Sequence, residues 1–329
     1  MATTRSPRKG SLQYWPRKRA ARPFMRISHY PELAEAKLNG FAGYKVGMTH
    51  LFVADNRPNS MTKGKSVLFP ATVVECPPLK VASVRFYRSS AYGSVVAREV
   101  FVSRDKNLGR RVLLPKKDAL GQLDEVAKEL GSFSDVRLNV YTQPHLSSVG
   151  KVKPELFEIA VGGKGVEGKF NYAKSVVGKE IPVADVLSEG QQVDVYSVSK
   201  GKGVQGPVKR FGVSLRSHKS EKGVRGPANV GSWTGNRSWT VAHAGRMGFH
   251  SRVDRNKWVL KLGTKPEEVN AKGGFVNYGV VRSAYLLLRG SLPGHVRRLV
   301  RLTPSRAPNH RLPVQAPSVD YTSLESRQG

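Results

Sequence analysis

The sequence predicts a mainly β protein with an inserted α/β region, a long basic loop and a basic N-terminal extension. Short runs rich in β-branched and aromatic residues, separated by Pro, Ser and Gly, recur through most of the chain. One internal stretch instead has apolar residues at helical spacing. The expected parts are a basic extension (1–39), the first part of a β domain (40–103), an α/β insertion (104–190), the second part of the β domain (191–304, with the loop at 200–257) and an extended tail (305–329).

The N-terminal extension is basic and contains several prolines. Between Met1 and Arg26 there are eight basic residues and no acid. Three prolines oppose regular structure, and a solvated basic tail would not need the aromatic side chain of Trp15. We therefore expect an arm that becomes ordered on RNA.

The first part of the β domain contains four strand-like segments. Their alternation and β-branched content predict an antiparallel sheet or a barrel. The segments are FAGYKVGMTHLFV (41–53), SVLFPATVVEC (66–76), LKVASVRFY (79–87) and SVVAREVFVS (94–103).

The insertion mixes helix and strand patterns. Apolar residues at helical spacing predict a helix from Asp118 to Leu130. Two strands, DVRLNVYTQ and LFEIAVGG, and a short helix over KFNYAKSVVG (169–178), closed by Gly178, follow. Acids concentrate here, and we expect this region to face solvent more than RNA.

The second part of the β domain begins with VDVYSVS (193–199), which delivers the basic loop. After the loop, WVLKLG and FVNYGVVRSAYLLLRG are expected to complete the domain. HVRRLVRLTPSRAP reads as a last alternating strand with Arg on its polar side.

The basic loop points to a polyanionic partner. From Ser199 to Lys265 there are 8 Lys and 7 Arg but two acids, Glu221 and Asp254, with three Trp among them. Disordered tracts are depleted in aromatics, so we expect a segment that orders against RNA, where cations neutralise phosphates and aromatics stack on bases. The candidate RNA-binding residues are Arg17, Lys18, Arg19, Lys200, Lys202, Lys209, Arg210, Arg216, His218, Lys219, Arg225, Trp233, Arg237, Trp239, Arg246, His250, Arg252, Arg255, Lys257, Arg297 and Arg298.

Composition narrows the class of protein. The 329 residues carry a net charge of +31 and 39% hydrophobic residues, which suits polyanion binding and still allows a core. The single cysteine, Cys76, rules out an intramolecular disulfide and Cys-based zinc sites and reads as a buried strand thiol. We expect no membrane span, no secretory signal and a cytoplasmic location.

Two motifs leave an enzyme as the alternative. Gly201–Gly206 matches GxGxxG, but Pro207 and basic residues follow where a helix is required, and no parallel βαβ pattern surrounds it. Gly163–Lys169 approaches a P-loop, but Phe170 stands where Ser or Thr binds Mg²⁺. No metal or catalytic residues are expected. An RNA-modifying or nucleotide-dependent enzyme remains the runner-up, followed by a DNA-compacting protein.

Several long motifs resemble the universal large-subunit ribosomal protein L-three family, in its archaeal form. The stretch from Asp194 to Gly203, with Gly206 and Arg210, resembles the family signature. GSWTGNRSWTVAHAGRMGFHSR, GGFVNYGVV, GSLPGHVRRLVRL and PRKGSLQYWPRKRA resemble the archaeal and eukaryotic branch. One departure is SEKGVRG, which lacks a histidine that eukaryotic members carry.

The resemblance implies a six-stranded barrel of the translation-protein type with an inserted α/β domain. It also implies a structural constituent of the large (50S) subunit, bound near the 3′ end of 23S rRNA and nucleating subunit assembly. The loop tip, Trp233, would approach the peptidyl-transferase centre. Proteins L-fourteen and L-twenty-four-e would be neighbours, and no cofactor is implied beyond Mg²⁺ or monovalent ions shared with rRNA.

Overall fold

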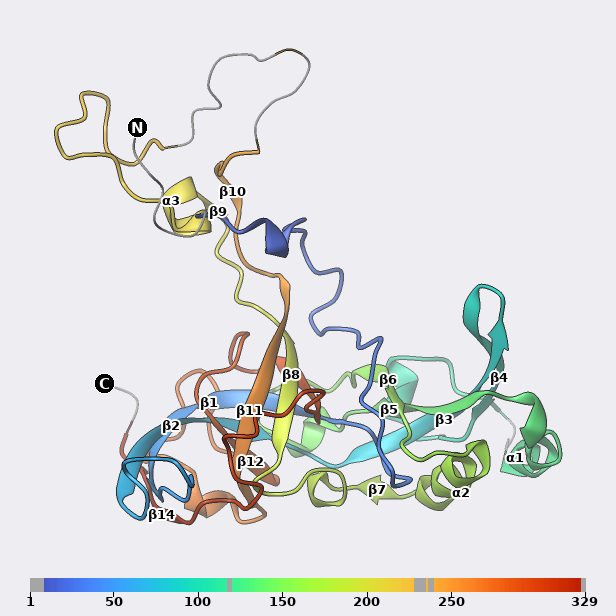
Figure 1. Ribbon diagram of the computed structural model, residues 1–329. Coiled ribbons are helices and arrows are strands. Elements are labelled where there is room, and N and C mark those ends of the chain that lie inside the picture. The colour runs from blue at the N-terminus through green and yellow to red at the C-terminus, as the bar shows by residue number, and fades with distance from the viewer. Residues whose placement is uncertain (1–8, 117–119, 228–234, 236–239, 327–329) are drawn as a thin grey trace. The chain divides into compact units, whose positions relative to one another are not determined.

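The computed structural model describes residues 9–116, 120–227, 235 and 240–326 (Figure 1). The chain divides into two compact units, each assembled from separate stretches of sequence. We call Met1–Pro23 with Val198–Arg252 the basic unit, and Phe24–Ser197 with Val253–Gly329 the core unit. The mainly β character predicted from the sequence is confirmed.

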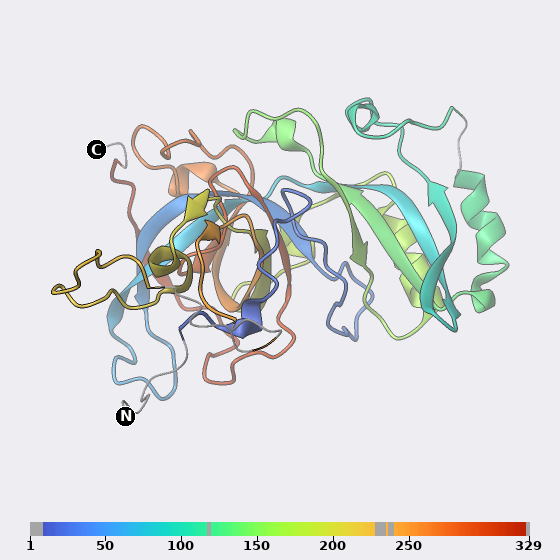
Figure 2. The same ribbon diagram turned by 90° about the horizontal axis from the view of Figure 1, so that it is seen from above.

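The larger sheet is antiparallel in the pairings whose register is defined. Its order is β13 (Leu299–Pro304), β8 (Gln192–Val198), β11 (Ser251–Gly263), β12 (Tyr285–Arg289), β2 (Ser66–Glu75), β1 (Phe41–Ala54) and β14 (Val319–Thr322). Strand β13 also pairs with β1, where Phe41 lies opposite Leu302. The series from β13 to β1 therefore returns on itself, and β1 and β2 are strongly curved (Figure 2).

The second sheet has the order β4-β3-β5-β6, with β7 pairing with β3. Its strands are β3 (Leu79–Ser90), β4 (Gly93–Phe101), β5 (Asp135–Tyr141), β6 (Leu156–Ala160) and β7 (Glu180–Ile181). Strands β3 and β4 were expected beside β1 and β2. Instead residues 83–90 of β3 pair with β4, and residues 80–87 pair through the other edge with β5.

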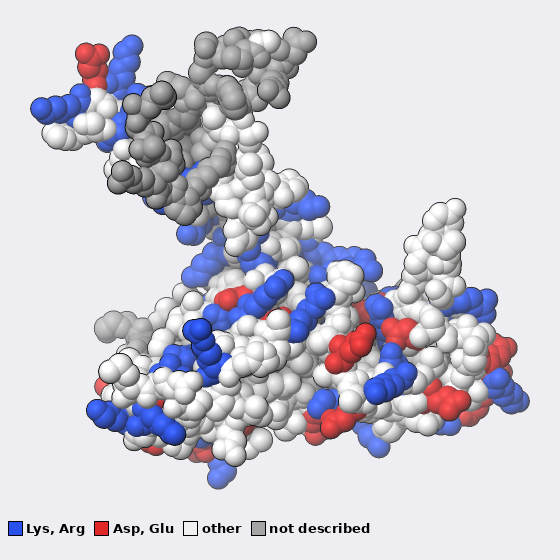
Figure 3. All heavy atoms as spheres, viewed as in Figure 1, with Lys and Arg blue, Asp and Glu red and all other residues white. Residues whose placement is uncertain are grey.

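The helices lie mainly with the second sheet. Helix α1 (Leu120–Ala127) falls inside the expected helix, and α2 (Val166–Val176) begins earlier than expected and ends before Gly178, whose φ is 78°. Acidic side chains gather on the part of the core unit around α1, α2 and the second sheet (Figure 3). The 3-10 helices are Leu12–Tyr14, Leu108–Arg110, Leu130–Ser132, Pro144–Leu146, Val183–Asp185 and Pro266–Glu268, and α3 is Pro207–Phe211.

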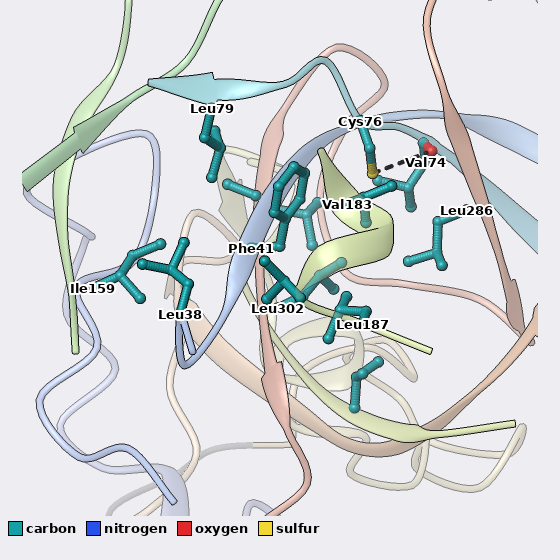
Figure 4. Close-up of a cluster of buried hydrophobic side chains, with 14 of the residues drawn as sticks. Leu38, Phe41, Val74, Cys76, Leu79, Ile159, Val183, Leu187, Leu286 and Leu302 are labelled. Carbon is teal, nitrogen blue, oxygen red and sulfur yellow. Dashed lines mark hydrogen bonds between the residues drawn. The ribbon is translucent and has the colours of Figure 1, made fainter. Parts of the chain in front are cut away.

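One hydrophobic cluster joins both sheets of the core unit. Side chains such as Leu38, Phe41 and Leu302 are almost fully buried in it (Figure 4). Cys76 is buried beside them, as the sequence predicts, and burial raises the pKa of its thiol. A neutral thiol packed this way is structural.

Residues 275–284 do not form the expected strand. They loop around a buried carboxylate, Glu75, which accepts hydrogen bonds from the backbone N–H groups of Arg282 and Ser283, at 2.7 and 2.9 Å, and from the Ser283 hydroxyl. The Tyr278 hydroxyl also donates to it. These bonds replace the pairing that a strand would have provided.

Arg301 does not lie on the polar side of β13. Every residue of β13 is buried, and Arg301 is 2% exposed. Its guanidinium donates to the Met25 carbonyl at 3.3 Å and to the Tyr30 hydroxyl at 2.8 Å, and lies 4.5 Å from the ring centroid of Phe157. The alternating pattern predicted an exposed Arg301, but its guanidinium is buried because it bonds to Met25 and Tyr30, in the chain that leads into β1.

The two ends of the chain differ from the simple extensions expected. Phe24, Ile27 and Leu38 are buried in the core unit, so only the first part of the 1–39 extension belongs to the basic unit. The C-terminal tail contributes β14, so β13 is not the last strand.

Candidate nucleic-acid interface

The basic unit is built on a pair of chain segments that leave and return to β8 and β11. The Ser199 N–H donates to the His250 carbonyl at 2.9 Å, and Lys202 and Gly203 exchange backbone bonds with Met247. Farther out, β9 (Val204–Gln205) pairs with β10 (Gly245–Arg246). The segments approach so closely that a Cβ on Gly248 would lie 2.0 Å from the Lys200 carbonyl oxygen. Residues 251–257 were expected as loop, but they belong to β11.

A short helix interrupts the stretch that was expected to be irregular. Helix α3 follows Gly206 directly, has proline at its first position and ends at Gly212, whose φ is 68°. Proline at the start and left-handed glycine at the end are strong local signals for such a turn of helix. The expectation that no helix follows the GxGxxG match was therefore wrong.

That match is still not a dinucleotide site in its geometry. A dinucleotide fold needs parallel strands, and β8 pairs antiparallel with β13. The P-loop-like segment also lacks the required form, because its residues from Val166 onward are already helical. Its lysine, Lys169, bonds to Asp135 at 2.6 Å.

Phe211 is the centre around which the basic unit packs. It is buried, and the ring of Trp15 stacks on it at a centroid distance of 5.9 Å. The guanidinium carbons of Arg17 and Arg210 lie 4.2 and 4.9 Å from its ring centroid. Trp15, which suggested an RNA-binding arm, thus has a partner inside the protein.

Two arginines tie the arm to the loop through backbone carbonyls, and a third ties together two parts of the loop. Arg17 donates from Nη1 to the Arg210 carbonyl at 3.1 Å, and Arg246 donates from Nη2 to the Arg17 carbonyl at 2.9 Å. Arg210 donates to the carbonyls of His243 and Arg246. A carbonyl satisfies the N–H donors but leaves the positive charge without a counter-charge.

Neighbouring positive charges contribute to lowering the pKa values of Arg17 and His250. Burial, then Arg210 and Arg252, lowers the pKa of Arg17. His250 is 7% exposed, its Nδ1 lies 3.0 Å from the Lys18 carbonyl, and burial together with Arg252, Arg246 and Arg17 lowers its pKa. His250 therefore helps to hold the arm as a neutral ring.

The charge of the basic unit is almost entirely uncompensated. Its described residues include 15 Lys and Arg and one carboxylate, Glu221. The ion pairs found among the described residues all lie in the core unit. The exposed candidates here are Lys18, Arg19, Lys200, Lys202, Lys209, Arg216, His218, Lys219 and Arg225.

Arg252 is a half-buried member of the basic unit, and the remaining candidate residues lie elsewhere. Arg255, Lys257, Arg297 and Arg298 belong to the core unit, where Lys257 is paired with Asp254 at 2.9 Å. Trp233, Arg237 and Trp239 lie outside the described residues. Sequence reasoning missed the packing roles of Phe211 and Gly248. The spacing from Pro207 to Gly212 could have indicated the short helix that carries Phe211, but no comparable signal marks Gly248.

Two other kinds of site were searched for along the described chain. No cluster of three or more His, Cys, Asp or Glu in the described ranges could hold a metal ion. None of the helices described is long and apolar enough to cross a membrane.

Known proteins resemble the chain over its whole length. The family model described as "Ribosomal protein L3" matches residues 1–329. A protein of Methanosphaera stadtmanae is 44% identical, and one of Methanothermobacter thermautotrophicus is 43% identical; each match covers 100% of both chains. One of Archaeoglobus fulgidus is 44% identical over 98% of both. All three carry the name "Large ribosomal subunit protein uL3".

Proposed function

Because the chain belongs to the ribosomal protein L3 family, we propose that its basic unit binds ribosomal RNA within the large subunit. The resemblance seen in the sequence, including its archaeal character, is confirmed by the full-length relatives. The chain is a large-subunit protein of the cytoplasmic ribosome, and the family is not one of enzymes.

The observation that supports RNA binding most directly is the uncompensated charge of the basic unit. Its arginines are held by carbonyls and aromatic rings, so their positions are fixed while their charges remain available. Phosphates release counterions when such cations neutralise them. Phosphate contacts position a protein, and RNA shape supplies the specificity.

The two units differ in composition, and we assign them different roles. The core unit contains the hydrophobic cluster. The basic unit has few apolar residues and supplies cations, aromatic rings and glycines that allow close approach. Mg²⁺ or monovalent ions near the interface would be shared with the RNA, as is usual where phosphates crowd together.

The finer placement comes from the family resemblance. We infer binding near the 3′ end of 23S rRNA, an early role in subunit assembly, and a loop tip with Trp233 directed toward the peptidyl-transferase centre. Proteins L-fourteen and L-twenty-four-e would be neighbours. A six-stranded barrel of the translation-protein type, with an inserted α/β domain, is supported by the pairing of β13 with both β8 and β1.

Sedimentation of cell lysate at high salt tests the proposal. The chain is expected to migrate with the large subunit and to resist release by salt. In a parallel assay at ~0.2 M salt, the purified chain should bind large-subunit rRNA and bind duplex DNA weakly. Release into the soluble fraction, or equal affinity for DNA, would contradict an integral rRNA-binding role.

A further inference from the structure

A row of exposed apolar side chains crosses three neighbouring strands of the core unit. On the outward face, Phe52 of β1 lies opposite Leu68 of β2 and Tyr321 of β14. The rings of Phe52 and Tyr321 are 5.8 Å apart. Leu68 is 52% exposed, Tyr321 46% and Phe52 38%. Single exposed apolar residues are ordinary, but a contiguous row marks an interaction site.

The loop that joins β1 to β2 is held rigid and presents one more apolar side chain. Asp55 accepts hydrogen bonds from the Arg57 guanidinium at 2.7 and 2.8 Å and from the hydroxyls of Ser60 and Thr62 at 2.6 Å. The bond from Arg57 is the largest cause that holds the pKa of Asp55 far below its usual range. Met61 is fully exposed on this loop. A loop fixed before binding loses little entropy when a partner docks.

We call Phe52, Leu68, Tyr321 and Met61 the apolar face. The strands beneath it carry no exposed Lys or Arg. In β1, β2 and β14 the charged residues are Lys45, Glu75 and Asp320, of which Lys45 and Glu75 are buried and Asp320 is exposed. Lys45 donates to the Gly294 carbonyl at 3.3 Å. Yet the chain has 55 Lys and Arg. A surface that faced phosphates would need cations, so the apolar face suits a protein.

The rim of the face indicates the charge of that protein. Lys63 and Lys65 are exposed on the same loop as Met61, on either side of Gly64. Strand β14 ends the sheet order, and no strand among the described residues pairs with its other edge, which offers a place for a further extended segment. Aromatic and Met side chains inside a polar rim are typical of protein interfaces.

We propose that the apolar face docks a second protein whose apolar contact surface is bordered by Asp and Glu. The partner is recognised by Phe52, Leu68, Tyr321 and Met61 and aligned by Lys63 and Lys65. This inference rests on membership of the large subunit and is independent of the RNA contacts proposed for the basic unit.

Photo-crosslinking in purified large subunits tests the identity of the occupant. A photoreactive phenylalanine is placed at Met61 or Tyr321, and the adducts are identified by mass spectrometry. We expect adducts with one protein, on peptides that contain Asp or Glu beside apolar residues. The exposed Leu113, which lies outside the face, is the control position. Adducts with rRNA, or no adduct above the Leu113 background, would overturn the proposal.

A charge substitution tests the energetics. Leu68→Lys should weaken docking roughly tenfold, so one protein is lost from salt-washed subunits while this chain and the rRNA remain. Leu113→Lys should lose nothing. Because Leu68 is half exposed, the variant is expected to fold, and its presence in subunits shows that it has. A full protein complement in the Leu68→Lys subunits would contradict the proposal.

Discussion

Arg17 and Arg210 are 193 residues apart in the chain, yet Arg17 donates a hydrogen bond from Nη1 to the Arg210 carbonyl oxygen at 3.1 Å. Both guanidinium groups also lie over the ring of Phe211. The two like charges repel, and Arg210 contributes to lowering the pKa of Arg17. The ring and the carbonyl hold them together. Two segments expected to be separate RNA-binding elements therefore form one unit.

Phe211→Ala should release the N-terminal arm. It removes the stack with Trp15 and the ring beneath Arg17, and buried Phe-to-Ala changes cost about 3–5 kcal/mol. Hydrogen exchange of residues 9–20 should rise sharply, while exchange in β1 and β2 stays unchanged. Leu215→Ala, at a half-exposed position in the same loop, is the control. Unchanged exchange in the arm would show that Phe211 does not anchor it.

Acidification should loosen the same unit. The pKa of His250 is lowered in the folded protein from its usual value of 6.5, so the native state favours the neutral ring. As pH falls below about 6.5, the unfolded form binds the proton first, and the stability contributed by the neutral ring is lost. Exchange protection of residues 17–20 should therefore fall between about pH 7 and 5. His250→Gln should remove this dependence; a variant that retains it would contradict the assignment to His250.

Arg301→Met should destabilise the core unit. The change leaves the Met25 carbonyl without this donor and removes the bond to the Tyr30 hydroxyl, which still donates to the Glu158 carbonyl. A buried group left unpaired costs about 1–3 kcal/mol. We expect the free energy of unfolding in urea to fall by about 2–4 kcal/mol. The matched control is Arg255→Met, whose side chain is exposed. Equal stability of the two variants would mean that Arg301 is dispensable.

The sequence was informative wherever periodicity and composition determine structure. Alternation found most strands, and the spacing of Leu123 and Val126 found α1. It failed where a long-range polar contact overrode the pattern. Arg301 looked like a polar-face residue, because nothing in the local sequence reveals the carbonyl and hydroxyl that surround it.

The local sequence of each strand also could not show which sheet the strand would join. Strands β3 and β4 share the β-branched and aromatic enrichment of β1 and β2 but pair in another sheet. For the interface, charge counting selected the Lys and Arg residues only as a class. It could not separate exposed cations such as Lys209 from those that bind the protein's own backbone, such as Arg246. That distinction depends on contacts across more than 200 residues.

The salt dependence of RNA binding tests the central claim most directly. The affinity of the full chain for large-subunit rRNA is measured across salt concentrations, for the natural chain and two triple variants. Lys200, Lys202 and Lys209, all exposed in the basic unit, are changed to Gln in the first variant. Lys128, Lys153 and Lys179, exposed in the core unit, are changed to Gln in the second.

Each phosphate contact contributes about 0.7–0.9 to the slope of log affinity against log salt. The first triple variant should therefore reduce the magnitude of the slope by roughly 2–3, while the second leaves it unchanged. An unchanged slope in the first variant, or an equal loss in both, would contradict RNA binding through the basic unit.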